Sequence, residues 1–197
     1  MIAVRHAAIG QSCSGAGQMP KLANAFTVGA WIKRLAADDG GVIYLSGTNA
    51  GAWQFGLTPD GRLTFSAGGQ VLATASQATA VNQWAYVAVT RQGTGSGSVR
   101  LWLNGVEVGT GSAGALAAPT GDKYIGGNPS DATSTWRGRI DELSLYNKAL
   151  AAAALQQLAA GSTCAMDGMS WATAFRWLTC GIAEAPGGPI YVPFTLP

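Results

Sequence analysis

The amino-acid sequence predicts an all-β fold, a two-sheet antiparallel jelly-roll sandwich. Three observations point to it: many short segments in which apolar and polar residues alternate, turn residues between these segments, and 28 glycines among 197 residues. Short strands separated by frequent turns are typical of sandwiches and jelly rolls. The length fits one undivided β domain. One short helix near 149–160 and a C-terminal extended arm complete the predicted architecture.

The first clear strand segment is Phe26–Lys33. Its even-numbered residues are apolar or small and face one way, whereas Trp31 faces the other way, as the two-residue period of a strand requires. The next segments, Trp53–Leu57 and Leu63–Ser66, are separated by the turn residues Pro59–Arg62. This spacing predicts a hairpin.

The second half of the chain predicts a central hairpin and a last strand. Asn104-Gly105 lies between two apolar runs, and both residues tolerate the positive φ of a type I′ turn. In the last predicted strand, RIDELSLY, strict alternation places Ile140 and Glu142 on one face. Asp141 and the leucines at 143 and 145 then lie on the other face, so the leucines are expected to point into the core.

Four stretches also carry a family resemblance, and they are FTVGAWIK, NQWAYVAVTRQGTGSGSVRLWLNGVEVG, YIGG and WRGRIDELSLYNKAL. In this order they resemble the laminin G-like, concanavalin A-like lectin-glucanase jelly-roll domains, which occur in many bacterial and viral proteins. The resemblance implies a laminin G-like jelly roll over 1–161, ending with an Ala-rich helix at Leu150–Leu158. Residues 162–197 match nothing in the family and are expected to form an apolar extension and arm.

Enzymatic chemistry is not expected. Glycosidases of related fold need two carboxylates about 5–9 Å apart. No Glu-x-Asp or Glu-x-Glu pair occurs, and the adjacent Asp141 and Glu142 should point to opposite faces of a strand. His6 is the single histidine, and no GxSxG motif surrounds any serine. We therefore predict a protein that is not an enzyme.

The resemblance implies two kinds of binding site. Calcium is a frequent ion of such domains and needs several oxygen ligands, for which Asp38, Asp39 and Asp141 are the candidates; the alternative is that these are turn residues. Sugars bind on aromatic platforms with a few polar partners. The candidates for a glycan platform are three aromatic residues near loops, which core packing would explain equally well: Trp53, Tyr124 and Trp136.

Charge and hydropathy exclude two classes of partner. The net charge is +2 and no run of basic residues occurs, so nucleic acid is not an expected partner. No segment is apolar enough to cross a membrane. Only 11% of residues are charged, against about 25% in ordinary soluble domains. Either uncharged polar groups solvate the surface, or partners cover much of it.

The C-terminal extension favours assembly. Its end has no charged side chain and contains several prolines, which forbid a regular helix and favour an extended arm. An apolar extended segment is expected to lie on a neighbour, so we predict a homo-oligomer, contacts with other virion proteins, or both. The predicted assembly residues are Trp171, Trp177, Ile190, Tyr191, Phe194 and Leu196.

These observations predict a non-catalytic structural protein on a virion surface, either a phage capsid decoration protein or a tail component. No secretory signal is visible at the start of the chain, so production in the host cytoplasm and release on the virion are expected. The alternative is an extracellular carbohydrate-binding or adhesion module that recognises a cell-surface glycan, with calcium as its candidate ion.

Overall fold

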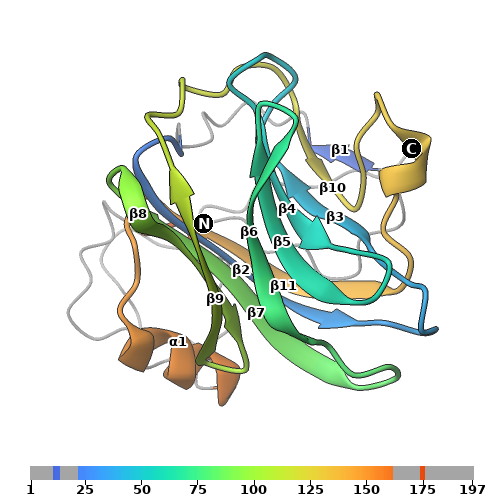
Figure 1. Cartoon of the computed structure of the whole chain (residues 1–197). Helices are drawn as coiled ribbons and strands as arrows, with labels where there is room; N and C mark the ends of the chain where they lie inside the picture. The colour runs from blue at the N-terminus through green and yellow to red at the C-terminus, as the bar shows by residue number, and fades with distance from the viewer. Residues whose placement is uncertain (1–10, 14–21, 162–173, 176–197) are drawn as a thin grey trace, which may run out of the picture.

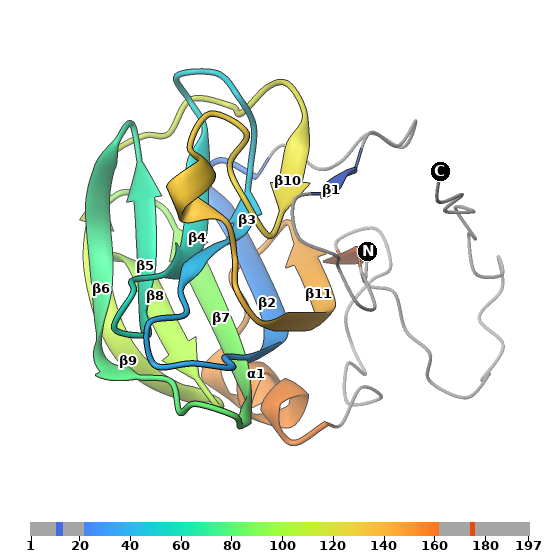
Figure 2. The same cartoon turned by 90° about the vertical axis from the view of Figure 1, so that its right-hand side faces the viewer.

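The computed structural model describes residues 11–13, 22–161 and 174–175. Its strands form two antiparallel sheets that lie face to face (Figures 1 and 2). Sheet A has the order β1-β10-β3-β4-β5-β6, and sheet B has the order β12-β11-β2-β7-β8-β9. The predicted jelly-roll sandwich is therefore confirmed.

The elements have the following bounds: β1 Gln11–Cys13, β2 Ala25–Lys33, β3 Gly41–Leu45, β4 Trp53–Leu57, β5 Arg62–Ala67, β6 Gln70–Ala78, β7 Trp84–Gln92, β8 Gly95–Leu103, β9 Val106–Ala113, β10 Lys123–Ile125, the short 3-10 helix η1 Ala132–Ser134, β11 Arg139–Tyr146, α1 Ala152–Ala159 and β12 Ala174–Phe175.

An aromatic cluster joins the two sheets at the centre of the core. The rings of Phe26 on β2 and Trp53 on β4 stack with centroids 4.3 Å apart and planes 6° from parallel. Tyr44 and Phe65 flank Trp53 within 5.6 Å. The indole N–H of Trp53 donates to the carbonyl of Leu22 at 2.8 Å, so its one polar group is satisfied inside the core.

The central hairpin forms where the sequence predicts it. Asn104 and Gly105 have φ values of 51° and 79°, the left-handed values that a type I′ turn needs. The turn joins β8 to β9 with Leu103 opposite Val106. The Asn104 side chain also accepts the backbone N–H of Tyr86 at 2.9 Å, which ties the turn to β7.

The strand β6 was not indicated by the sequence. β6 is rich in alanine and polar residues, which have low strand propensity, yet it forms the edge of sheet A. It packs against β9 of sheet B, where small residues let the two backbones approach each other. A Cβ on Gly111 of β9 would come within 2.0 Å of the Leu72 carbonyl oxygen. Tertiary packing of small residues thus closes this side of the sandwich.

Helix α1 covers part of the outer face of sheet B, the face turned away from the core (Figure 1). Leu155 and Leu158 bury against Tyr86, Trp102 and Tyr146 of that sheet. The helix lies inside the predicted range 149–160. No helix among the described residues has the length and apolar character needed to cross a membrane.

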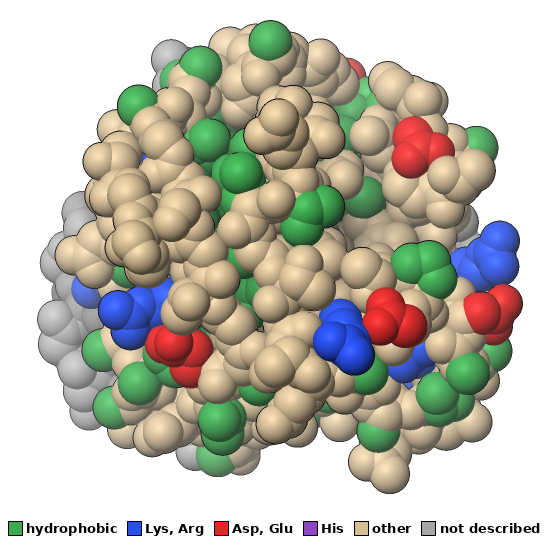
Figure 3. All heavy atoms as spheres, in the orientation of Figure 1, with side chains coloured by type: hydrophobic (Ala, Val, Ile, Leu, Met, Phe, Trp, Pro, Cys, Tyr) green, Lys and Arg blue, Asp and Glu red, His purple; other side chains and the backbone are tan. Residues whose placement is uncertain are grey.

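Uncharged groups dominate the surface seen in Figure 3, and its charged side chains lie mostly in the lower half of that view. This distribution leaves both sequence alternatives open, solvation by uncharged polar groups and coverage by partners.

We expect Gly111→Ala to lower the free energy of unfolding by about 1–3 kcal/mol, because the added methyl group overpacks the contact between β6 and β9. Gly114→Ala is the matched control, since a Cβ there meets nothing within 4 Å. Urea unfolding of both variants measures the difference. Equal stability of the two would show that β6 and β9 do not pack closely.

Candidate functional site

A β-bulge in β11 creates the candidate site. Asp141 pairs with Trp31 of β2, and Ser144 pairs with Gly29, so two residues of β11 lie opposite the single residue Ala30. The extra residue is Glu142, whose φ is 48°. This left-handed backbone at the first bulge position ordinarily favours glycine, and a non-glycine residue there stores strain.

The bulge corrects the predicted face assignment of this strand. Ile140 lies in the core at 2% exposed, on the same side as Leu143 and Leu145, whereas strict alternation placed it opposite them. Asp141 and Glu142 lie between the two core-facing positions and are both half-buried. The expectation that these adjacent carboxylates point to opposite faces was therefore wrong, because it assumed an unbroken two-residue period.

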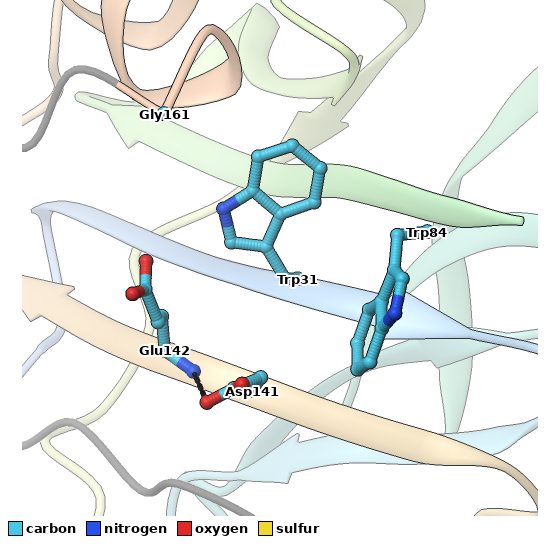
Figure 4. Close-up of a pocket in the computed structure, with 5 residues that line it drawn as sticks. All are labelled: Trp31, Trp84, Asp141, Glu142 and Gly161. Atoms are coloured by element: carbon cyan, nitrogen blue, oxygen red, sulfur yellow. Dashed lines mark hydrogen bonds between the residues drawn. The ribbon is translucent and has the colours of Figure 1, made fainter.

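Both carboxylates line one shallow, open groove of about 350 Å³, together with Trp31, Trp84 and Gly161 (Figure 4). The two indoles come from β2 and β7, and both carboxylates come from β11. The backbone N–H of Glu142 donates to Asp141 Oδ1 at 2.8 Å. This bond fixes the orientation of the Asp141 carboxylate relative to the bulge.

Packing against neighbouring side chains fixes the position of the Trp31 indole. Its ring meets Tyr86 edge to face, with centroids 5.7 Å apart, and it packs against the cluster beneath α1. Gly29 makes room for Tyr86, since a Cβ at that position would lie 2.3 Å from the Tyr86 hydroxyl oxygen. Trp84 is 41% exposed and offers an apolar surface to solvent. The groove therefore combines a fixed aromatic wall with an exposed aromatic surface.

Neither carboxylate has a basic partner among the described residues, whose ion pairs are Asp60 with Arg62 and Arg100 with Glu107. Lys33 and Arg139 lie in the next row of the sheet, opposite each other, but they are not among the residues that line the groove. The described lining thus carries two negative charges and no positive charge.

The predicted glycan platform does not form. Trp53 and Trp136 are 1% and 2% exposed, so they are core residues and cannot stack on a sugar. Tyr124 is half-buried on β10, which pairs with β1 and β3 in sheet A. The aromatic content that suggested a loop platform belongs instead to the core, and this corrects the prediction for both tryptophans.

The predicted calcium ligands do not gather either. Asp39 is buried, and its Oδ2 accepts the backbone N–H groups of Leu35 and Ala36, both at 2.7 Å, so it closes a turn. Asp38 is exposed, and Asp141 lies in the groove. No group of three or more His, Cys, Asp or Glu side chains that suits a metal ion occurs within 11–13, 22–161 and 174–175. The donor set therefore does not fit a calcium site built from these residues.

The six predicted assembly residues, Trp171, Trp177, Ile190, Tyr191, Phe194 and Leu196, lie outside the described residues.

Sequence patterning did not single out the groove residues. Trp31 was placed correctly on the face opposite Phe26, but Trp84 was not singled out, and Glu142 was assigned to the face opposite Asp141. The available signal was two tryptophans at outward positions of neighbouring strands. The third component, a bulge at an Asp-Glu pair, has no glycine to mark it.

Comparisons with known proteins agree with this architecture. A family model described as the concanavalin A-like lectin/glucanases superfamily matches residues 11–156. No curated protein matches the chain.

Solved structures with related folds include a proposed carbohydrate-binding protein from Bacteroides ovatus (21% identity, TM-score 0.57), of which the chain spans 46% while 79% of the chain is covered. A heptameric pentraxin from Limulus polyphemus shows 18% identity and a TM-score of 0.54, with 77% of this chain and 81% of that chain covered. Domain 4 of an extracellular arabinanase from Geobacillus stearothermophilus, solved with arabinotriose, shows 21% identity and a TM-score of 0.55, with 70% and 67% covered. At these identities the likeness shows the fold.

Replacing the strained glutamate tests whether the bulge lowers the stability of the fold. We expect Glu142→Gly to raise the free energy of unfolding by about 0.5–1 kcal/mol, because glycine adopts the positive φ without strain although it loses more chain entropy. Glu142→Gln keeps the strain and should change stability by less than about 0.5 kcal/mol. Chemical unfolding measures both. A glycine variant less stable than the glutamine variant would contradict the strained bulge.

Proposed function

Because this chain belongs to the concanavalin A-like lectin/glucanases superfamily, we propose that it is a carbohydrate-binding module whose binding site is the groove on the outer face of sheet B. The single observation that carries this proposal is the convergence of two indoles and two carboxylates in that groove.

The chemistry of the groove suits a sugar. A pyranose ring has an apolar face of C–H groups that packs on an indole, and its hydroxyl groups donate hydrogen bonds to carboxylate oxygens. Trp84 supplies exposed aromatic surface, while Asp141 and Glu142 supply the acceptors. Binding sites of this kind combine apolar lining with a few placed polar groups. The fixed wall formed by Trp31 limits the conformational entropy lost when a ligand binds.

The related structures support the same class of ligand. The Bacteroides protein is a proposed carbohydrate-binding protein, and the arabinanase domain was solved with an oligosaccharide. Neither shares more than 21% identity with this chain, so their ligands indicate a class and not a particular sugar.

The proposed role is binding without cleavage. Glycosidases keep one carboxylic acid protonated at neutral pH by holding it in a sheltered, apolar position. The groove here is open, and Asp141 and Glu142 both come from one short stretch of β11. This arrangement suits recognition of hydroxyl or amino groups better than protonation of a leaving group.

The virion-surface role, the oligomeric state and the extracellular alternative stay predictions. They rest on the C-terminal extension and on the start of the chain, which lie outside the described residues except for 174–175. A glycan-binding role for the jelly roll is compatible with any of these settings, since the groove lies on the jelly roll itself.

We expect the purified protein to bind glycans on an array, and Trp84→Ala to weaken that binding at least tenfold, or about 1.4 kcal/mol, because the exposed stacking surface is lost. Val71→Ala is the control, since Val71 is 64% exposed and lies away from the groove on β6. Calorimetric titration with the best array ligand gives the affinities. A variant at Trp84 that binds as well as the unchanged protein contradicts the proposed site, and released sugar in the same sample contradicts binding without cleavage.

A further inference from the structure

We propose that the groove on sheet B recognises a cationic amino sugar, a glycan unit that carries a free protonated amine. This inference rests on the proposed carbohydrate-binding function and names the substrate class that the same site would take.

The charge of the groove carries the inference. Asp141 and Glu142 are neighbours in sequence, and the bulge brings both of them to one groove. No Lys or Arg of the described residues lies within ion-pair distance of either carboxylate. A ligand that covers these half-buried groups removes water from two negative charges, which is costly unless the ligand supplies a compensating charge. An ammonium group supplies that charge, whereas a neutral hydroxyl does so only in part.

The aromatic residues favour the same ligand. The face of an indole carries negative electrostatic potential and attracts an ammonium group. Trp31 and Trp84 line the groove with the carboxylates, as Figure 4 shows, so four of the five described lining residues favour a cation. The same indoles pack on the C–H face of the sugar ring, which explains why the ligand is an amino sugar rather than a simple amine.

Two basic residues beside the groove limit how much positive charge a ligand can carry and where. Lys33 and Arg139 form the adjacent row on the outer face, with Lys33 opposite Trp84. They do not line the groove, but they disfavour a ligand with positive charge spread over all of its length. The amine nearest Asp141 and Glu142 is therefore the one that determines affinity. Sugars with carboxylate groups are disfavoured at that position because like charges repel.

Three tetrasaccharides with one β-1,4-linked glucose backbone test the inference: a glucosamine tetramer with one free amine and three N-acetylated units (the free-amine tetramer), its fully N-acetylated counterpart, and the neutral glucose tetramer. Titration calorimetry of the full chain at mildly acidic pH, where the sugar amine is protonated, gives the affinities. We expect the free-amine tetramer to bind at least tenfold more tightly than the other two. Its affinity should also fall as salt rises, because added ions screen the attraction.

Charge variants assign the effect to the groove. Asp141→Asn and Glu142→Gln should each weaken binding of the free-amine tetramer at least fivefold, and Asp141→Asn keeps the oxygen that accepts the Glu142 N–H. Asp122→Asn removes one exposed negative charge elsewhere and should leave the affinity unchanged. Thermal unfolding verifies that each variant is folded.

Each outcome decides between the two proposals. Equal affinity for the three tetramers, or preference for a neutral one, overturns the amino-sugar inference and leaves carbohydrate binding intact. If none of the three tetramers binds, the amino-sugar inference is overturned. If the protein binds no glycan on the array either, the proposed function is overturned as well. Undiminished binding by both groove variants overturns the assignment to Asp141 and Glu142.

Discussion

One extra residue in β11 determines what the outer face of sheet B presents to solvent. With strict alternation, Ile140 and Leu143 could not both face the core, because their positions differ by three, an odd number, and faces alternate with a two-residue period. The bulge at Glu142 resolves this conflict and lets both side chains bury. As a consequence of the bulge, Asp141 and Glu142 lie together beside Trp31. Without the bulge the two carboxylates would not line one groove.

The same face of sheet B serves two purposes. Along the part near Tyr86 and Trp102, helix α1 buries the apolar side chains and completes a second hydrophobic cluster. Beyond the end of the helix, where Gly161 is one of its lining residues, the same face forms the groove. The positive φ of Glu142 lowers the stability of the folded state. The residue pairs between β2 and β11 on both sides of the bulge hold the backbone in this conformation.

The sequence predicted the sandwich well because its signals are local. Alternation in Phe26–Lys33 and the Asn104-Gly105 turn need only neighbouring residues to be recognised, and the short helix needs only composition. β6 was missed because its alanines become strand residues only through contact with β9.

The groove was beyond sequence reasoning for a different reason. It joins Trp31 to Asp141, more than a hundred positions later, across a register shift that no glycine announces. Trp53 illustrates the converse error, since an aromatic residue next to a loop turned out to be the centre of the core. The most direct test follows the indole N–H signals of the tryptophans by ¹H–¹⁵N NMR while the free-amine glucosamine tetramer is added. The account predicts shifts for Trp31 and Trp84 and none for Trp53, whereas unmoved signals from the two groove indoles would contradict it.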